Sequence, residues 1–515
     1  MFRVPNRSAL PLLTLLALPL ASLAQTGVID TGSGPVQGVL QNEIAIFRGL
    51  PFAAPPVGAL RWEAPQPPAP WTAVREAGTS RPACYQKPGL SLEGGGDPGQ
   101  LSEDCLYLNV FSKNPDPAAR MPVMVWIHGG ALIFGAGSLP LYDGSALARR
   151  GAVVVTINYR LGPLGFFAHP ALERQRPGGS VNFGLLDQIA ALQWVQKNIA
   201  AFGGDPARVT VFGQSAGAQS VLALMASPLA KNLFSGAIAQ SPYGVPSNKR
   251  AKALASGNAV ASALGLPGAQ TSVAALKAIP AERLAALEGK GLSLAPGFIV
   301  GDAAVPVPIL QAFQQGREAK VPLIIGNTSN DASVALAFGI DPADLIKQLG
   351  KARVLVKPLY PGVNDDRQLG REVARDVVFS AFARRIAYLH SKTSPTWRYY
   401  FSHGATASPN ADGVGHGGEV PFVMGTTAAC DCLGGPATAA DLAVEQRVGN
   451  RWFQFAASKK PDGAIGWEQD GRLRAMALEI GTEDSLRPAF MRARLDAFIT
   501  GLNIAAARAS RKPAD

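Results

Sequence analysis

Histidine is scarce in this sequence, with five residues among 515. A reaction that uses an imidazole base must therefore draw on a short set of candidates, namely His128, His169, His390, His403 and His416. Cysteine is also scarce, with four residues, and none of the four has histidines near it at the spacing of a zinc site. The sequence therefore gives no indication of a metal centre.

Long apolar runs and clusters of basic residues are missing as well. After residue 24, no stretch is long and apolar enough to span a bilayer. The formal net charge is +11, but lysine and arginine are scattered rather than grouped with aromatic residues. This distribution favours a solvated surface over a nucleic-acid interface.

Glycine and proline, by contrast, are abundant, with 56 and 41 residues. They follow no period, and the chain contains no internal repeat, so collagen-like and low-complexity chains are excluded. The excess indicates many long, ordered loops.

The first 24 residues have the pattern of a secretory signal peptide. Two arginines precede an apolar run over 9–20, and small residues follow up to Ala24. A membrane anchor is the alternative, but the run is short and two prolines interrupt it. We therefore expect cleavage after Ala24 and a mature protein, 25–515, that is exported to the periplasm or secreted, without stable membrane insertion.

An exported chain with four cysteines is expected to form disulfides. Cys84 and Cys105 enclose a polar, glycine-rich loop that a disulfide would hold in place. Cys430 and Cys432 are separated by one residue. A bridge over so short a span is strained, so free thiols and a labile bridge are both open for this pair.

Short β-rich runs alternate with helical patterns, which predicts an α/β fold. Several runs are apolar throughout, as in strands buried on both faces of a mostly parallel sheet. Over 183–202, apolar residues recur every three or four positions and stop at Gly203, which predicts an amphipathic helix. A second amphipathic helix is expected over 442–458. The expected strands are 123–127, 152–159, 209–212, 236–240, 321–326 and 397–402.

An alanine-rich, helical stretch over about 245–300 lies between two expected core strands. We interpret it as an inserted helical subdomain that roofs a site. No linker divides the rest of the chain, so 25–515 is expected to form one large domain with helices on both faces of the sheet.

The stretch GQSAG at 213–217 places Ser215 between an apolar strand and a helix of small residues. A serine at such a tight turn is lifted clear of the sheet, and flanking glycines avoid the collisions that a Cβ would cause. The helix N-terminus supplies N–H groups and a positive dipole end, which favour a developing oxyanion. A glycine-rich turn without chemistry is the competing interpretation, and the partners described next favour a nucleophile.

A second small-residue loop, over 128–131, ends an earlier strand. Its N–H groups can approach a carbonyl oxygen closely. We therefore expect Gly130 and Ala131, together with Ala216 after the nucleophile, to form an oxyanion hole. A plain glycine turn after a strand is the alternative.

The base and the acid are chosen by their position along the chain. His416 lies in a glycine-rich loop after the last core strand, where an imidazole can reach the serine, and His403, at the end of a strand, is its rival. Asp331 follows an expected strand, whereas its rival Asp302 lies in a turn. The order Ser215, Asp331, His416 is that of the α/β-hydrolase arrangement.

Blocks of sequence from about residue 27 to the last helix resemble the type-B carboxylesterase family, which includes bacterial carboxylesterases and the cholinesterases. They include FRGLPFAAPPVGALRW, SEDCLYLNV, VMVWIHGG, NYRLGPLGF and HGGEVPF. The resemblance implies an α/β-hydrolase fold and hydrolysis of a small-molecule ester through an acyl-enzyme, without metal or cofactor. It also implies a Cys84–Cys105 disulfide and a buried Arg61–Glu103 ion pair.

The sequence departs from the family pattern near the expected site. Gln214 stands where the family has a glutamate beside the nucleophile, Asp331 where it has a longer glutamate, and Ala131 where it has a glycine. The 84–105 loop contains no tryptophan, which disfavours a cholinesterase. Because Gln214 removes a negative charge, neutral or acidic esters are expected to be preferred over cationic ones. The alternative is that replacing the glutamate by a near-isosteric amide has no effect on substrate preference.

Two other functions are open at the level of sequence. The segments LGFFAHPAL and WRYYF are similar to bacterial relatives that cleave polycarboxylate esters of mycotoxins. Some family members are adhesion proteins that lack the serine, so a non-catalytic binding protein is the alternative of another class. The serine, acid and histidine, however, are all present here in order.

Overall fold

The computed structural model describes most of the chain. The expected signal peptide, residues 1–24, lies outside the described residues except for Ala24, and it remains a prediction. The described ranges are 24–87, 96–244, 247–287, 297–337, 339–350, 353–405, 412–461, 466–471 and 474–509.

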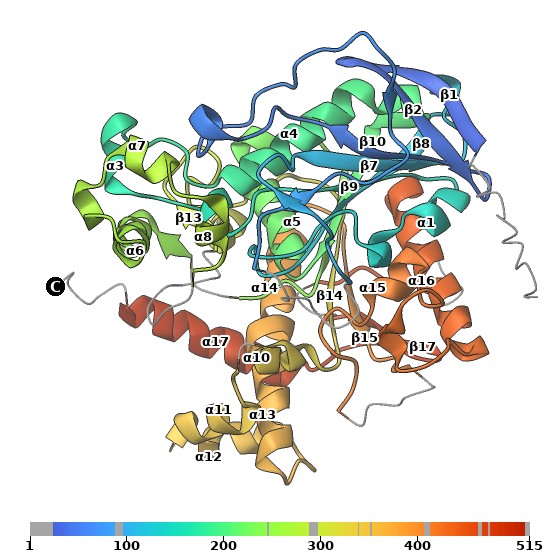
Figure 1. Cartoon of the computed structure of the whole chain (residues 1–515). Coiled ribbons are helices and arrows are strands. Elements are labelled where there is room, and N and C mark those ends of the chain that lie inside the picture. Colours follow the sequence, from blue (N-terminus) through green and yellow to red (C-terminus); the bar gives the residue numbers. More distant parts are fainter. Residues whose placement is uncertain are drawn as a thin grey trace, which may run out of the picture.

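A sheet of thirteen strands runs through the molecule (Figure 1). Its central strands are parallel, and antiparallel strands flank them at both edges. The predicted mostly parallel sheet and its six expected strands are therefore confirmed, with shifted ends. In sheet order the strands are β1 (Ala24–Thr31), β2 (Gly34–Gln41), β3 (Ile44–Pro51), β7 (Tyr107–Ser112), β9 (Val153–Ile157), β8 (Met121–Ile127), β10 (Gly204–Gln214), β11 (Gly236–Gln240), β14 (Leu323–Thr328), β15 (Thr396–Phe401), β16 (Ala477–Ile480) and β17 (Asp484–Arg487), with β4 (Arg75–Glu76) beside β2.

Two strand pairs stand outside this sheet. They are β5 (Ala83–Cys84) with β6 (Leu101–Ser102), and β12 (Asn248–Lys249) with β13 (Ile299–Val300).

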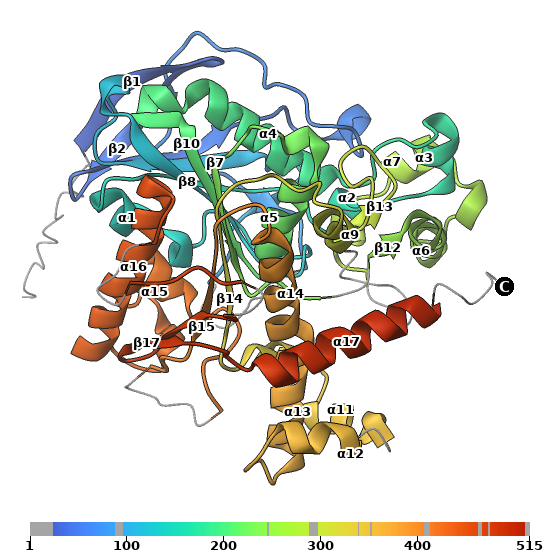
Figure 2. The same ribbon diagram turned by 180° about the vertical axis from the view of Figure 1, so that it is seen from behind.

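Helices lie on both sides of the sheet, and α17 packs against α14 (Figure 2). In the described chain, none of them combines the length and apolar character needed to cross a membrane. They are α1 (Ser145–Arg149), α2 (Gly162–Gly165), α3 (Pro170–Gln175), α4 (Phe183–Asn198), α5 (Ala216–Ala226), α6 (Arg250–Ala263), α7 (Val273–Lys277), α8 (Ala281–Ala285), α9 (Ile309–Gln314), α10 (Val334–Ala337), α11 (Pro342–Leu349), α12 (Arg353–Val356), α13 (Asp366–Arg375), α14 (Ala381–His390), α15 (Val420–Met424), α16 (Ala439–Ser458) and α17 (Arg492–Ala509).

Successive side chains along the central strands belong alternately to two hydrophobic cores, one on each face of the sheet. On β8, Val123 and Val125 belong to the core that contains α4 and α5. Met124 and Trp126, between and after them, belong to the core that contains α16. Both faces of the sheet are covered, which explains why these strands read as continuous apolar runs.

The helix α4 differs from its prediction. It ends in a 3₁₀ turn before Gly203, as expected, but it is not amphipathic, because Asp187 and Gln188 are buried as well. Arg160 donates to Asp187 at 2.7 Å, and Gln188 donates to Ser220 at 3.0 Å. These hydrogen bonds to side chains of other segments allow the helix to be covered on its polar side too.

The described part of the stretch over 245–300 is mostly helical, with the short strands β12 and β13 at its ends. It contains α6, α7 and α8, which share a separate hydrophobic cluster with Trp62, Leu164 and Phe167. Residues 245–246 and 288–296 lie outside the described ranges. That this stretch roofs a site remains a prediction.

Candidate active site

Ser215 lies at the sharp turn between β10 and α5. Its backbone has φ 57° and ψ −121°, which is rare for a residue other than glycine. Its N–H donates to the carbonyl of Gln240 at 2.8 Å, and its own carbonyl accepts the N–H of Gln219 at 2.9 Å. The turn is therefore held on both sides of the serine.

The glycines beside Ser215 are required by the neighbouring strand. A Cβ on Gly217 would lie 2.0 Å from the carbonyl oxygen of Ile127, and a Cβ on Gly213 would lie 2.6 Å from the same atom. Both separations are far shorter than any Cβ contact in a folded protein. The steric reason for glycine at both positions is therefore present.

The loop after β8 lies directly against this turn. A Cβ placed on Gly129 would be 3.2 Å from the Cβ of Ser215. In the part of the chain that the structure describes, the N–H groups of Gly130, Ala131 and Ala216 donate no hydrogen bond to another protein group. They are therefore available to an oxygen atom of a ligand.

His416 and Asp331 form a close buried pair. The Nδ1 of His416 lies 2.7 Å from Oδ1 of Asp331. The other carboxylate oxygen accepts hydrogen bonds from the Ser241 hydroxyl at 3.0 Å and the Thr328 N–H at 2.9 Å. The N–H of His416 donates to the Ser333 hydroxyl at 2.8 Å. Both loops are therefore held in place by hydroxyl groups that the sequence reasoning missed.

Gln214, beside the serine, contacts the other ring nitrogen of His416. Its Nε2 lies 3.2 Å from the imidazole Nε2, and the residue is buried. Among the described residues, the Ser215 hydroxyl makes no hydrogen bond. Proton transfer between Ser215 and His416 would therefore need a change in side-chain position.

An aromatic ring covers the imidazole from one side. Phe379 lies in a π-helical turn, Asp376–Ser380, between α13 and α14, and its ring centroid is 5.2 Å from that of His416. Such turns within helices occur often at functional sites.

Glu419 is a fully buried carboxylic acid three residues after His416, and the sequence reasoning did not single it out. Burial, and then the charge of Asp331, raise the pKa of Glu419 to about 7. Its Oε1 is 3.3 Å from the Gln240 amide and 3.4 Å from the Tyr399 hydroxyl, while its Oε2 has no partner among the described residues. The block HGGEVPF contained the signal that would have found it.

The rival residues lie in other hydrogen-bond networks. The Nε2 of His403 is 2.9 Å from Oδ1 of Asp441. Asp302 accepts backbone N–H groups at 2.8 to 3.3 Å, those of Val181 and Val305 among them. Neither contacts His416 or Ser215, so the structure brings together Asp331 and His416 rather than their rivals.

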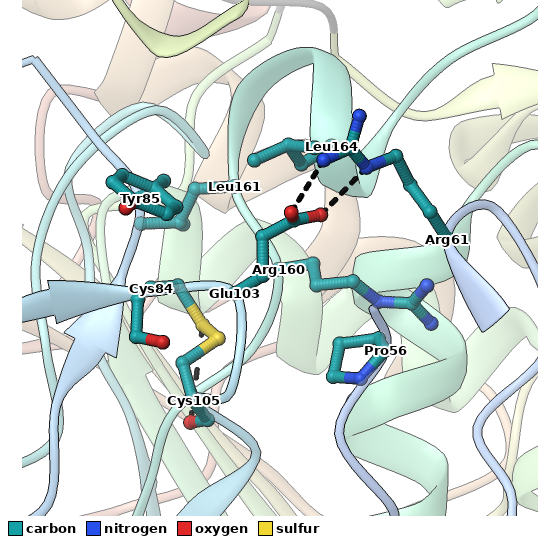
Figure 3. A pocket seen from close by; sticks show the side chains of 10 residues that line it. Pro56, Arg61, Cys84, Tyr85, Glu103, Cys105, Arg160, Leu161 and Leu164 are labelled. Atoms are coloured by element: carbon teal, nitrogen blue, oxygen red, sulfur yellow. Dashed lines mark hydrogen bonds and ion pairs between the residues drawn. A yellow bond between two sulfur atoms is a disulfide. The ribbon is translucent and has the colours of Figure 1, made fainter. Parts of the chain in front are cut away.

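The implied Arg61–Glu103 ion pair is present. The Nε of Arg61 donates to Glu103 at 2.7 Å, and a second bond joins its Nη2 to the other carboxylate oxygen. Figure 3 shows this pair in a small pocket beside the Cys84–Cys105 disulfide, which the structure also contains. None of the residues lining this pocket is Ser215, Asp331 or His416, so it belongs to the supporting structure.

The second cysteine pair is also joined. Of the two possibilities that the sequence left open for Cys430 and Cys432, the structure has the disulfide. In the described ranges, no group of three or more His, Cys, Asp or Glu side chains is placed to hold a metal ion.

Comparison with known proteins extends over nearly the whole chain. The model of the Carboxylesterase family matches residues 25–357 and 363–497. The chain is 35% identical to fumonisin B1 esterase of Sphingopyxis macrogoltabida over 505 residues, covering 91% of this chain and 90% of that protein. It is 37% identical to para-nitrobenzyl esterase of Bacillus subtilis (strain 168) over 459 residues, covering 85% and 92%. The solved structure of a thermophilic PNB esterase matches with a TM-score of 0.80 and 33% identity, covering 92% of this chain and 99% of that one.

Proposed function

This chain belongs to the carboxylesterase family and is an ester hydrolase of that family, and we propose that it acts through an acyl-enzyme formed on Ser215. The observation that carries the proposal is the 2.7 Å contact between His416 and Asp331, formed within reach of the strained Ser215 turn. Gln214, the residue before the serine, already contacts the other ring nitrogen of that histidine.

His416 acts as the base in this proposal. As Oγ of Ser215 attacks the ester carbonyl, Nε2 of His416 takes the hydroxyl proton and the carbonyl π electrons move to oxygen. The tetrahedral intermediate collapses, the alcohol leaves with that proton, and the acyl group stays on Ser215. Water, activated by His416, then attacks the acyl group. The acid is released and Ser215 regains its proton.

Asp331 and the backbone N–H groups stabilise the charges that develop during the reaction. Asp331 accepts the Nδ1–H of His416, which selects the productive tautomer and stabilises the imidazolium. Gly130, Ala131 and Ala216 donate to the oxyanion, which is usually the largest single contribution to such reactions. Their N–H groups have no competing acceptor in the described part of the protein.

We propose neutral or acidic esters as the substrates. Gln214 places a neutral amide, rather than a carboxylate, at the histidine and beside the serine. A carboxylate at that distance would repel an anionic acyl group and attract a cationic one. The positive net charge of the chain acts in the same direction.

A polycarboxylate ester of the fumonisin type is a second candidate. The support is the 35% identity to fumonisin B1 esterase over 91% of this chain. The test is incubation of the purified protein with fumonisin B1 and detection of the released acid. Turnover comparable to that of simple esters would favour this candidate, and the absence of release would remove it.

We also propose that the protein is exported, on the evidence of its first 24 residues alone. Expression of the full chain in a bacterium, followed by N-terminal sequencing of the periplasmic fraction, tests this. A mature N-terminus at Gln25 is expected, and a cytoplasmic protein that keeps Met1 would contradict it.

The test of the main proposal is hydrolysis of p-nitrophenyl acetate, butyrate and octanoate by the mature protein and by Ser215→Ala. We expect activity in the first protein only, with a chain-length profile that reports the size of the acyl pocket. A fluorophosphonate should label Ser215 in the first protein and not in the variant. Lack of both activity and labelling would favour the binding-protein alternative.

The charge preference is tested with neutral, anionic and cationic esters of equal size. The mature protein should have the lowest kcat/KM for the cationic ester, and Gln214→Glu should raise that value relative to the anionic ester. Equal kcat/KM for all three esters in both proteins would rule the preference out.

A further inference from the structure

Gln86 lies two residues after Cys84 and is 4% exposed. Its side-chain amide makes three hydrogen bonds to backbone groups. Oε1 accepts the N–H of Gly135 at 2.8 Å, and Nε2 donates to the carbonyl of Gly135 at 3.0 Å and to that of Cys84 at 3.1 Å. The amide therefore pairs with Gly135 as a neighbouring strand would.

This pairing admits one orientation of the amide. The oxygen must face the N–H of Gly135 and the nitrogen must face the two carbonyl groups. No ionisable or shorter side chain reproduces all three bonds: a glutamate has no donor, and an asparagine is one methylene shorter. The contact is therefore specific for glutamine.

Gly135 closes the loop that carries the oxyanion donors. A Cβ on Gly135 would lie 2.5 Å from Nδ1 of His128 and 3.0 Å from the carbonyl oxygen of Gly129. The same Nδ1 is 2.9 Å from that carbonyl oxygen. Gly135 therefore packs directly on the peptide that precedes Gly130, so a shift of one moves the other.

The loop has an unfavourable backbone that needs such support. Ala131 has φ 52° and Leu132 has φ 63°, a region that residues with a Cβ seldom occupy. Conformations of this kind persist only where the surroundings hold them. One anchor is the N–H of Gly162, which donates to the Leu132 carbonyl at 2.7 Å. The pairing of Gln86 with Gly135 is the anchor at the far end of the loop.

We propose that Gln86 is a positioning residue for the oxyanion hole. It joins the segment closed by the Cys84–Cys105 disulfide to the loop that presents the N–H groups of Gly130 and Ala131. This inference rests on the proposed function and assigns to the disulfide-bonded segment a role in the rate of the reaction.

The expected effect is on the transition state rather than on substrate binding. The oxyanion donors make their strongest bonds when the carbonyl oxygen becomes charged. Loss of the anchor displaces these donors, and displacements near 1 Å lower rates by up to about 100-fold. The three bonds of the Gln86 amide are all made to backbone groups of the protein, so its loss should act on the oxyanion donors and KM should change little.

The test compares Gln86→Leu with Gln100→Leu. Gln100 lies in the same disulfide-closed segment, is exposed, and contributes its backbone carbonyl but not its side chain to the fold. For Gln86→Leu, kcat per titrated active site should fall about 10- to 100-fold with KM within twofold. Inhibition constants for a trifluoromethyl ketone, which forms a tetrahedral adduct, should rise by the same factor, and Gln100→Leu should change neither. Gln86→Glu, which keeps one bond, provides the same comparison if the leucine variant folds poorly.

An unchanged kcat per active site, or a fall in kcat matched by a rise in KM, would overturn the proposal. Failure of the proposed function is seen separately, because the unmodified protein would then hydrolyse no ester. In that case the rate of amide hydrogen exchange over 128–137 tests whether Gln86 anchors the loop. Faster exchange in Gln86→Leu than in Gln100→Leu supports the anchor, and equal exchange overturns it.

Discussion

At the scale of single residues, the two aspartates that the sequence offered as the acid have different surroundings. Asp331 contacts the His416 imidazole at 2.7 Å. Asp302 instead accepts backbone and amide N–H groups from two segments, Asn182 and Ala304 among the donors. The first is placed to assist a histidine, and the second holds the turn after β13 against the start of α4.

Asp331→Asn should lower kcat by about 10⁴-fold, because an amide cannot hold His416 in the tautomer that accepts the serine proton. The measurement is kcat per titrated active site with p-nitrophenyl butyrate. Asp302→Asn is the control. It should cost stability, since it exchanges an acceptor for a donor, but should keep kcat per active site. Equal losses of kcat in the two variants would contradict the assignment of the acid.

Glu419 predicts a pH dependence of stability. Its pKa in the folded protein is about 7, above the ordinary glutamate value near 4.5, because burial and the Asp331 charge favour the neutral acid. Between these values the folded state holds a proton that the unfolded state has lost. The free energy of unfolding should therefore fall as the pH rises from about 4.5 to 7, by at most about 3 kcal/mol.

Glu419→Gln cannot titrate, so it should flatten this dependence. The measurement is urea unfolding of both proteins at pH 5, 6, 7 and 8. A slope between pH 5 and 7 that is the same in both proteins would show that other groups cause it.

At the scale of elements, the contact between β8 and α5 depends on a missing side chain. Gly217→Ala would place a Cβ 2.0 Å from the Ile127 carbonyl oxygen. Because both groups belong to rigid elements, the substitution should cost about 3 kcal/mol or more and displace Ser215. Thermal unfolding and fluorophosphonate labelling measure the two effects.

Gly501→Ala is the matched control. Gly501 lies within α17, and a Cβ there meets no atom within 4 Å. Alanine should therefore stabilise the protein by about 0.5–1 kcal/mol, since it removes the glycine penalty in a helix. A stabilising effect at both positions would contradict the steric argument for Gly217.

At the scale of the whole molecule, Arg61 links distant parts of the chain. It pairs with Glu103, and its Nη1 donates to the carbonyl groups of Lys277 and Ile279, at and just after the end of α7. The guanidinium is almost fully buried. One side chain thus joins the disulfide-bonded segment to the stretch that carries α6, α7 and α8.

Arg61→Met should lower the free energy of unfolding by about 3–5 kcal/mol, because it leaves a mostly buried carboxylate and two carbonyl groups without their donor. Glu103→Gln should cost less, since the bonds to the two carbonyl groups remain. Urea unfolding gives both values. Arg474→Met removes an exposed pair with Glu468 and should change stability by less than about 1 kcal/mol. A similarly small change for Arg61→Met would contradict its linking role.

Much of this molecule follows from short stretches of sequence. The parallel strands, the turn at Ser215 and the glycines beside it follow from local propensity and sterics, which depend on a few neighbouring residues. The order of serine, acid and histidine along the chain predicts the catalytic residues, and that assignment stays a prediction. The amphipathic character expected of α4 was wrong, because the partners that allow Asp187 and Gln188 to be buried lie on other elements.

Contacts between distant segments were decided by the tertiary structure. It separated Asp331 from Asp302, and it brought Gln86 onto Gly135. It also buried Glu419 beside the Asp331 charge, which changes the chemistry of that acid. Such contacts depend on the paths of whole loops across the sheet, and no short stretch of sequence specifies those paths.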